Sequence, residues 1–488
     1  MGFLFAFKRV PLLEGRQGGH RVSDPLAQDV VVMKFGGTSV EDAEAIRRVV
    51  SIVRNRARRS AVVVVSALAG VTDELVAVAD HAAQRRFADA QSGVMRLRAR
   101  HFRLADELLR NAAHVEFRQG MKERFAELES FLKSVVTGDL TPSAKDHILG
   151  FGEVFSSRLL AEVFNAADLR ATWVDARRCI ITDGHHGRAR PLPESEWQVR
   201  EALQPLMASG QIPVMGGFVA ATGEGVPTTL GRGGSDLSAS VVGSALDARE
   251  IEIWTDVNGI MTADPRLCPD ANVIPTITFK LAAELAHLGA KVLHPATLLP
   301  AMRKNIPVCV RNSRRPNQPG TRVVSDGGEA DSVAAITVKK GIAYLIISAD
   351  GYGRPELLRH ALEICEHHEC GIELVLAAGT GIELLVSSFN NAQETVAELE
   401  NLGTSVAWKN HKALISVLSD GDAGQEKREQ LLNALGELHV RVIGRGLPGE
   451  RLCVVVDESE IEISVRRLHR ALFPIEACSE FNLCTAGQ

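Results

Sequence analysis

Two adjacent glycines and a lysine make residues 34–40 (KFGGTSV) the first segment of the chain that could do chemistry. Gly36 and Gly37 would let backbone N–H groups approach phosphate oxygens closely, and Lys34 would add a full positive charge. The spacing differs from the P-loop pattern. We interpret the segment as a phosphate-binding turn, and the alternative is a tight strand-to-helix turn whose lysine reaches the surface.

Two further segments offer weaker signals. Ser66 and Thr72 bound a loop (SALAGVT) after a run of valines, where open α/β sheets bind ligands. The alternative for Thr72, which precedes Asp73, is a helix cap. Glu153 follows a glycine, and its alternative role is that of an acidic residue near a helix start that interacts with the macrodipole.

The segment 228–236 (TTLGRGGSD) surrounds an arginine with three glycines at a helix entry. Arg232 could therefore bind a carboxylate through two hydrogen bonds. Asp236 could hold Mg²⁺ indirectly or orient an ammonium group, whereas in the alternative Ser235 or Asp236 caps the helix. Two later loops, 254–266 and 289–295, add Asp256, Arg266 and Lys291 as polar candidates, and they too lie at strand or helix ends.

The elements that position these loops alternate between strand and helix. Buried strands are predicted at 30–33, 62–65, 212–215, 251–254 and 307–310, and helices at 235–246 and 281–287. A helical insertion at about 81–136 has apolar residues on one face, namely Phe117, Met121, Phe125, Leu128 and Leu132. Residues 29–325 therefore read as one α/β domain with a largely parallel sheet between helices.

Turn-forming residues at 314–320 and 325–328 predict a linker, after which the pattern changes. Residues 332–488 read as two small α+β units, at about 341–411 and 412–488. The first has strands at 332–338, 343–348, 371–376 and 382–387 around a helix at 355–368. The second has strands at 413–418, 440–443 and 452–456 and helices at 425–438 and 461–472.

Composition excludes several classes of function. The chain of 488 residues has 55 Lys+Arg against 60 Asp+Glu and only 5% aromatic residues, which argues against nucleic-acid binding. Its apolar runs are too short to span a membrane. Eight cysteines without a Cys-x-x-Cys pair indicate free thiols and a cytoplasmic location. Residues 1–28 are expected to form a loose extension.

Two motifs are interpreted as unrelated to ligand binding. Residues 444–449 (GRGLPG) match Gly-x-Gly-x-x-Gly, but a strand rather than a helix is predicted to follow, so we expect a hairpin turn. Residues 365–370 (CEHHEC) offer four metal-type ligands, but His367 and His368 are expected on different faces of a helix end, which argues against zinc.

Taken together, the glycine-rich and polar loops between residues 29 and 325 resemble the aspartokinases, which have the amino-acid kinase fold. The resemblance is greatest to the monofunctional, lysine-sensitive type. It rests on residues 34–40, 66–72, 152–153, 229–236, 254–256, 264–266 and 289–295, all in order. The two C-terminal units resemble ACT domains, which in this family bind an amino-acid effector and pair between subunits.

This resemblance implies roles for individual residues. The residues that contact the transferred phosphate would be Lys34, Phe35, Gly36 and Gly37, with Lys34 and Asp236 as catalytic residues. The residues that hold aspartate would be Ser66, Thr72, Glu153, Arg232, Gly233, Gly234 and Ser235, with Arg232 on the α-carboxylate and Glu153 near the ammonium. The residues that hold the nucleotide would be Thr255, Asp256, Met261, Arg266, Lys291 and Val292. Met261 stands where family members often carry tyrosine.

The implied activity is ATP-dependent phosphorylation of the side-chain carboxylate of L-aspartate to 4-phospho-L-aspartate, the first step toward lysine, threonine and methionine. A carboxylate is already an anionic nucleophile at neutral pH, so no general base is needed. Mg²⁺ would accompany ATP without a direct protein ligand, and the chain would form a homodimer or a dimer of dimers through its ACT units. The alternatives are a kinase for another acidic amino acid and a non-catalytic amino-acid sensor.

Lysine is expected to inhibit weakly or not at all, whereas oligomerisation is expected to persist. The effector-binding stretch of lysine-sensitive relatives is rich in Thr, Ser and Glu, whereas residues 372–379 here read IELVLAAG.

Overall fold

The computed structural model describes residues 30–56, 60–289, 293–326, 334–348, 354–378, 381–387, 389–419, 424–436, 438, 441–445 and 451–473. The expected N-terminal extension (residues 1–28) lies outside the described residues, as do Lys291 and Val292.

An eight-stranded sheet forms the centre of the N-terminal part, in the order β3-β5-β2-β1-β8-β10-β11-β9. Its strands are β1 (Val31–Phe35), β2 (Ala61–Val65), β3 (Ala171–Val174), β5 (Ile212–Gly216), β8 (Glu250–Thr255), β9 (Thr276–Thr278), β10 (Val308–Asn312) and β11 (Thr321–Val324). Every pairing is parallel except that of β10 with β11. The predicted largely parallel sheet is confirmed, and its central strands are the predicted runs of buried β-branched residues.

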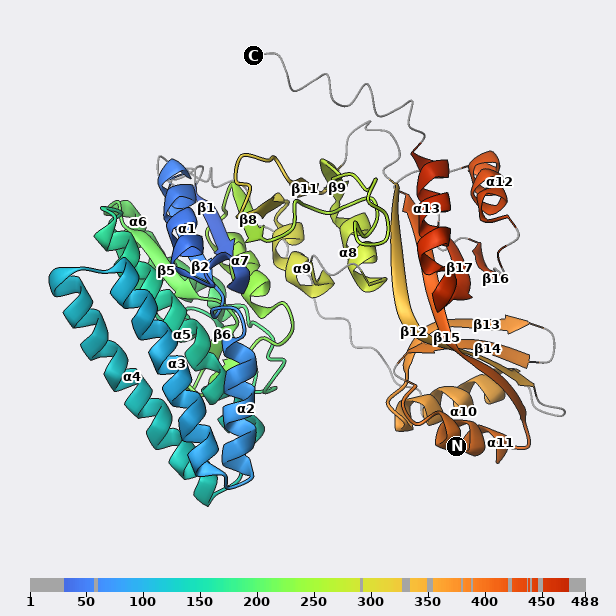
Figure 1. Ribbon diagram of the computed structural model, residues 1–488, viewed down its shortest axis with the longest axis horizontal. Helices are drawn as coiled ribbons and strands as arrows, with labels where there is room; N and C mark the ends of the chain where they lie inside the picture. Colours follow the sequence, from blue (N-terminus) through green and yellow to red (C-terminus); the bar gives the residue numbers. More distant parts are fainter. Residues whose placement is uncertain are drawn as a thin grey trace, which may run out of the picture.

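Helices cover both faces of this sheet (Figure 1). One core contains Val31, Met33 and Phe35 of β1, and it is completed by α1 (Ala43–Arg56), α2 (Val71–Ala83), α3 (Phe87–Leu108), α4 (Asn111–Thr137) and α5 (Pro142–Ala166). The other core contains Val32, and it is completed by α6 (Glu194–Ala208), α7 (Gly234–Ala245), α8 (Phe279–His287) and α9 (Pro295–Arg303). Alternate residues of one strand thus face opposite layers.

Helices α3 and α4 form the long extension beside α2 and α5 (Figure 1). The five apolar residues predicted to share one face of the insertion, Phe117 to Leu132, are all buried in this layer. The predicted apolar face of the helical insertion is therefore confirmed. Within the described residues, no helix combines the length and apolar character needed to cross a membrane.

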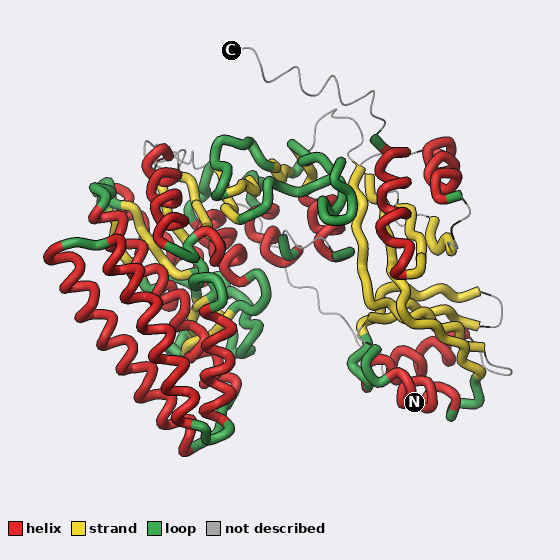
Figure 2. The backbone as a smooth tube through the Cα atoms, viewed as in Figure 1, coloured by secondary structure: helices red, strands yellow, loops and turns green. Residues whose placement is uncertain are grey.

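A second, antiparallel sheet lies apart from the first (Figure 2), in the order β13-β14-β12-β15-β17-β16. Its elements are β12 (Ala334–Ser348), α10 (Arg354–His367), β13 (Gly371–Ala378), β14 (Gly381–Ser387), α11 (Ala392–Glu400), β15 (Ser405–Ser419), α12 (Gly424–Leu435), β16 (Arg441–Arg445), β17 (Arg451–Asp457) and α13 (Ile461–Leu472). The architecture matches the predicted ferredoxin-like α+β class.

The central strands of this sheet differ from the prediction. Two short strands were expected at 332–338 and 343–348, but a single strand, β12, runs from 334 to 348 with register shifts between Lys339 and Tyr344. Its first half pairs with residues 414–419 and its second half with residues 405–412. The two α+β units therefore share β12 and β15. Helix α11 was not predicted.

The smaller elements include the expected hairpin. Strands β16 and β17 pair antiparallel, as a hairpin requires. The Gly-x-Gly-x-x-Gly motif begins at Gly444 within β16, and its residues 446–449 lie outside the described residues. A three-stranded sheet is formed by β4 (Ile181–Thr182), β6 (Val219–Thr222) and β7 (Pro227–Thr229). Short 3₁₀ helices occupy Gly37–Ser39, Ala176–Arg178 and Glu458–Glu460.

Candidate active site

The loops predicted to bind phosphate and substrate meet because β1, β2 and β8 end at one edge of the sheet. Phe35 is in register with Val65 on one side and with Trp254 on the other. Parallel strands place their carboxyl ends together, where open α/β sheets bind ligands. Residues 36–40, 66–72 and 255 onward therefore leave the sheet side by side.

Glycines allow the first two loops to touch. A Cβ atom on Gly37 would lie 2.9 Å from the carbonyl oxygen of Ala67, too close for a side chain. The N–H of Ala69 donates to the carbonyl of Gly37 at 3.2 Å, and the N–H of Gly36 donates to the carbonyl of Trp254 at 3.0 Å. The Gly36 amide therefore stabilises the fold and is not available to a phosphate.

Lys34 and Asp236 form an ion pair at the centre of this edge. Lys34 Nζ lies 2.6 Å from Asp236 Oδ1, and both side chains are largely buried. Lys34 is the penultimate residue of strand β1, and Asp236 lies in the first turn of α7. The lysine does not reach the surface, so the alternative of a surface lysine is wrong. Asp236 holds the ammonium group at the sheet edge.

Glu153 is buried in the middle of α5, eleven residues after the helix begins at Pro142. The macrodipole alternative is therefore wrong. Burial raises the pKa of Glu153 to about 8, although a hydrogen bond from the backbone at Ala67 and the charge of Lys34 both oppose the rise. Its Oε2 atom is buried without a hydrogen-bond partner. A buried, unpaired carboxylate oxygen is a strong acceptor for a cationic group.

A second pair of glycines, at the end of β5, joins Glu153 to the start of α7. A Cβ on Gly216 would lie 2.9 Å from the Cβ of Glu153, and a Cβ on Gly217 would lie 2.6 Å from the Cβ of Ser235. Ser235 and Glu153 thus approach the same turn. This contact brings the predicted substrate residues of α5 and α7 into one site.

Arg232 lies exposed between Gly231 and Gly233, which have φ angles of 72° and 71°. Such positive angles favour glycine, and they turn the chain sharply before α7 begins at Gly234. The arginine is therefore presented at the helix entry, as the sequence predicted.

Asp146 anchors the strand that leads into this turn. It is 2% exposed and accepts hydrogen bonds from the Thr229 N–H at 3.1 Å and the Thr229 hydroxyl at 2.5 Å. It also accepts from the Gly187 N–H, at 3.1 and 3.0 Å to its two carboxylate oxygens, and lies 2.9 Å from His186 Nδ1. The sequence analysis missed Asp146, since its partners lie 40 to 83 positions away.

The helix-cap alternatives do not hold. Helix α2 is capped by Gly70 and α7 by Gly233, and neither helix has a side-chain capping bond. Thr72 lies half-buried in the first turn of α2 beside the loop, and Ser66 is half-buried at its start. Both are placed at the same edge as Lys34. Ser66 connects β1 to α5, because its N–H donates to the carbonyl of Phe35 and its own carbonyl accepts from the Ser156 hydroxyl.

The predicted nucleotide residues follow β8. Thr255 ends the strand, and its hydroxyl lies 3.3 Å from Asp256. Met261 pairs with Val273 in an isolated bridge farther along the loop. Arg266 is mostly exposed and forms an ion pair with Asp264 at 2.7 Å. In the described part of the chain, the structure thus joins Arg266 to Asp264 rather than to the residues around Lys34.

The segment that contains Lys291 and Val292 is bounded by described residues on both sides. A Cβ on Gly233 would lie 3.0 Å from the Cβ of His294. The chain after residue 292 therefore returns to the entry of α7.

A local sequence pattern could have predicted the turn at Gly216 and Gly217. In the sequence, Gly216 and Gly217 come directly after the predicted strand at 212–215, and Gly36 and Gly37 come shortly after the predicted strand at 30–33. A pair of glycines near the end of a buried strand therefore marks both turns. No comparable signal marks Asp146.

Comparison with known proteins agrees with this arrangement. The model of the amino acid kinase family matches residues 29–312. "Aspartokinase 3, chloroplastic" of Arabidopsis thaliana is 32% identical over 93% of this chain and 84% of its own length. "Lysine-sensitive aspartokinase 3" of Escherichia coli (strain K12) is 32% identical over 91% of this chain and 99% of its own.

A solved structure extends the likeness to three dimensions. The crystal structure of E. coli aspartokinase III in complex with aspartate and ADP has a TM-score of 0.76 and 30% identity, and the alignment covers 91% of this chain and 100% of that one.

Proposed function

Because the chain belongs to the amino acid kinase family and, within it, to the aspartokinases, we propose that it uses ATP to phosphorylate the side-chain carboxylate of L-aspartate. The product is 4-phospho-L-aspartate, and the reaction is the first step toward lysine, threonine and methionine. The single observation that carries the proposal is the site itself: a buried lysine–aspartate pair beside an unpaired buried glutamate at one sheet edge.

The transfer needs little covalent assistance from the protein. A carboxylate oxygen of aspartate attacks the γ-phosphorus, the bond from that phosphorus to the β,γ-bridging oxygen breaks, and ADP leaves with the electron pair. The nucleophile is already ionised, so the main obstacle is repulsion between anions. Lys34, held by Asp236, supplies positive charge where the transferred group passes.

The substrate is oriented by groups of opposite charge. Arg232 is exposed at the entry of α7 and is suited to the α-carboxylate, because a guanidinium binds carboxylates through two bonds. The unpaired Oε2 of Glu153 is suited to the α-ammonium. Glu153 therefore favours a free amino acid over an acylated one, whose nitrogen carries no charge.

Magnesium fits the site as a partner of the triphosphate. Mg²⁺ at kinase sites is bound mostly by phosphate oxygens and water, with one or two carboxylates. Asp236 is the carboxylate beside Lys34, and its Oδ1 is already paired. It would hold hydrated Mg²⁺ indirectly, and the ion would neutralise charge on the phosphates.

The C-terminal sheet supports the assembly part of the proposal. Residues 29–325 form the catalytic unit, and residues 332–488 form the regulatory units through which two chains pair. Strands β13 and β16 are the edges of the sheet, and Ile372 on β13 is 40% exposed. Exposed strand edges and apolar side chains are commonly covered by a second copy. Sedimentation of the full chain would show a dimer or a tetramer, and a monomer at micromolar concentration would contradict this.

Lysine sensitivity and location belong to the same proposal. We keep the expectation that lysine inhibits weakly, because residues 372–379 lack the hydroxyl-rich character of lysine-sensitive relatives. Inhibition by sub-millimolar lysine would contradict it. A cytoplasmic location is supported by the free thiols of Cys179, Cys268, Cys309, Cys365, Cys370 and Cys453.

The specificity is tested by measuring ADP release with Mg-ATP and a panel of acidic amino acids. We expect turnover with L-aspartate and at least ~100-fold lower kcat/KM with L-glutamate and N-acetyl-L-glutamate, because a site shaped around paired charges rejects substrates that misplace them. Preference for either alternative would overturn the proposed substrate. Binding of amino acids without ADP release would favour a sensor.

A further inference from the structure

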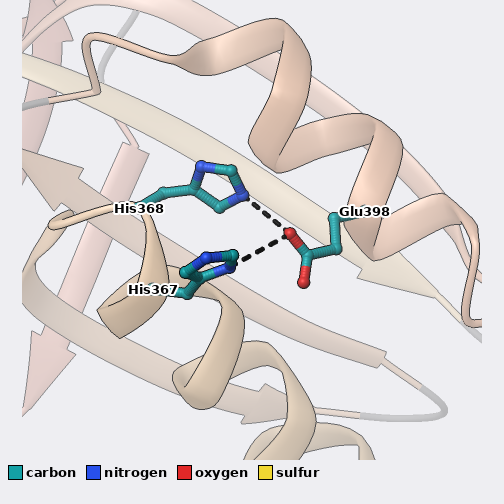
Figure 3. A group of neighbouring side chains, drawn as sticks. All are labelled: His367, His368 and Glu398. Carbon is teal, nitrogen blue, oxygen red and sulfur yellow. Dashed lines mark hydrogen bonds and ion pairs between the residues drawn. The ribbon is translucent and has the colours of Figure 1, made fainter.

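Two histidines and a glutamate gather on the first ACT-like unit (Figure 3). Their helices, α10 and α11, lie far from β1 and α7 of the kinase site (Figure 1). His367 ends α10, His368 follows it, and Glu398 lies near the end of α11. The sequence analysis expected the histidines on different faces, and this is wrong. Both imidazoles point toward the same carboxylate oxygen.

The distances are those of a group that can converge on one ion. His368 Nε2 lies 2.8 Å from Glu398 Oε2, and His367 Nδ1 lies 3.5 Å from the same atom. The three candidate ligand atoms all lie within 4.8 Å of one another. Ligand atoms around a tetrahedral zinc ion are about 3.3 Å apart, given Zn–N and Zn–O distances of about 2.0–2.2 Å. Small side-chain rotations would therefore suffice.

Part of the group is fixed by the fold. The His368 side chain is 11% exposed, whereas that of His367 is 73% exposed. The His368 N–H donates to the Ile364 carbonyl at 3.1 Å, and the Cys370 N–H donates to the Cys365 carbonyl at 2.8 Å, so the backbone around the helix end is held. One ligand is thus positioned in advance, and the exposed one is free to close on an ion.

The cysteines of the same sequence motif are not part of the group. Cys365 and Cys370 are buried in the apolar core with Leu357 and Leu399. Glu398, from a distant part of the chain, completes the set instead. Two imidazoles and one carboxylate are a ligand set that favours zinc and similar borderline cations over magnesium, which prefers oxygen ligands.

We propose that His367, His368 and Glu398 bind one Zn²⁺-like divalent cation, which joins α10 to α11 on the regulatory part of the chain. Water would complete the coordination, because three protein ligands leave a position open. The site is separate from Lys34 and Asp236 and does not depend on the proposed kinase function.

The test uses the full chain, stripped of metal by a chelator and then titrated with Zn²⁺ by calorimetry and with Co²⁺ by visible absorption. We expect one site per chain of micromolar affinity and a Co²⁺ spectrum typical of four- or five-coordinate geometry. Mg²⁺ should not compete. His368→Gln and Glu398→Gln should each weaken this site by at least about tenfold, since each removes a ligand.

Matched controls lie on the same two helices. His360→Gln on α10 and Glu394→Gln on α11 leave the three ligands in place and should bind Zn²⁺ like the wild type. Glu394 is exposed, whereas His360 is half-buried beside Arg359. Melting temperatures without metal would verify that both control variants fold. If His368→Gln and Glu398→Gln bind Zn²⁺ as tightly as the controls do, or if the wild type binds none in the micromolar range, the proposal is overturned.

Discussion

Lys34 carries the charge on which the proposed transfer most depends. Replacement by methionine keeps most of the apolar stem of the side chain but leaves Asp236 without its partner. We predict that Lys34→Met lowers kcat by ~100-fold or more, because the lost cation stabilises charge that develops in the transition state. Circular dichroism would verify the fold, and Lys122→Met, at an exposed position of α4, is the control. A near-normal rate in a folded variant would remove Lys34 from the site.

Glu153 gives the enzyme a pH dependence whose sign can be stated. Its pKa of about 8 means that the carboxyl is mostly protonated at neutral pH, whereas an ammonium partner requires the ionised form. We predict that kcat/KM for aspartate rises as the pH increases from about 6.5 to 8.5. Glu153→Gln should lower kcat/KM and abolish this rise. A wild-type profile that is flat over this range would contradict the assignment.

The raised pKa of Glu153 also affects the free energy of unfolding, which should fall as the pH rises, whereas kcat/KM should increase. The folded carboxyl keeps its proton up to about pH 8, whereas the ordinary value is 4.5, so the folded state binds more protons between these limits. The free energy of unfolding must therefore fall as the pH rises through this window, as far as Glu153 is concerned. Thermal melts of the wild type and Glu153→Gln at pH 6 and 8.5 should show a smaller loss in the variant.

At the level of elements, Asp146 joins α5 to the strand that leads into Arg232. We predict that Asp146→Asn raises the KM for aspartate several-fold and leaves that for ATP nearly unchanged, as should Arg232→Ala. The amide cannot accept all the donors that converge on the carboxylate, and the unmet bonds should also cost about 1–3 kcal/mol of stability. Asp139→Asn, exposed just before α5, is the control. Equal effects on both substrates would place this loop at the nucleotide.

The elements around the site could be predicted largely because their signals are local. Runs of β-branched residues identified β1, β2, β5, β8 and β10, and the parallel arrangement then brought their loops to one edge. Asp146 could not be found this way, because its role depends on partners that only the folded chain brings together. Glu153 was predicted as a ligand from family resemblance, but its burial follows from the packing of α5 on Gly216.

Strand pairing in the folded chain explains why the predicted bounds of the strands in the second sheet were wrong. Two strands were predicted at 332–338 and 343–348, and Gly341, which lies between these ranges, has a φ of 70°. The strand nevertheless continues, because β15 pairs with β12 on both sides of the irregularity. Pairing with a long neighbour therefore outweighed the local preference of one glycine.

At the scale of the whole molecule, the loop proposed to bind the nucleotide is attached directly to the C-terminal α+β part. Thr262, next to Met261, lies 2.9 Å from His469 Nε2 of α13, and its carbonyl accepts from the Ile336 N–H at 2.7 Å. Burial lowers the pKa of His469 and so favours the neutral imidazole. Ala263 shares a core with Leu468. Structural changes in the ACT-like units can thus reach the loop proposed to bind the nucleotide through these contacts.

This attachment gives a testable consequence. We predict that His469→Phe, which keeps a ring but removes the hydrogen bond, raises the KM for ATP several-fold with little effect on that for aspartate. It should also lower the melting temperature, because Thr262 loses a buried partner. Glu462→Gln, exposed on the same helix, serves as the reference. Unchanged ATP kinetics in His469→Phe would show that this contact is only structural.

The central claim is that a phosphoryl group is transferred to the side-chain carboxylate of aspartate. Acyl phosphates react with hydroxylamine, so the product can be trapped as a hydroxamate and identified by mass spectrometry while ADP is measured in the same sample. The account predicts aspartate β-hydroxamate in an amount equal to ADP for the wild type, and loss of both in Lys34→Met. ADP release without β-hydroxamate, or with a hydroxamate at the α-carboxyl, would contradict it.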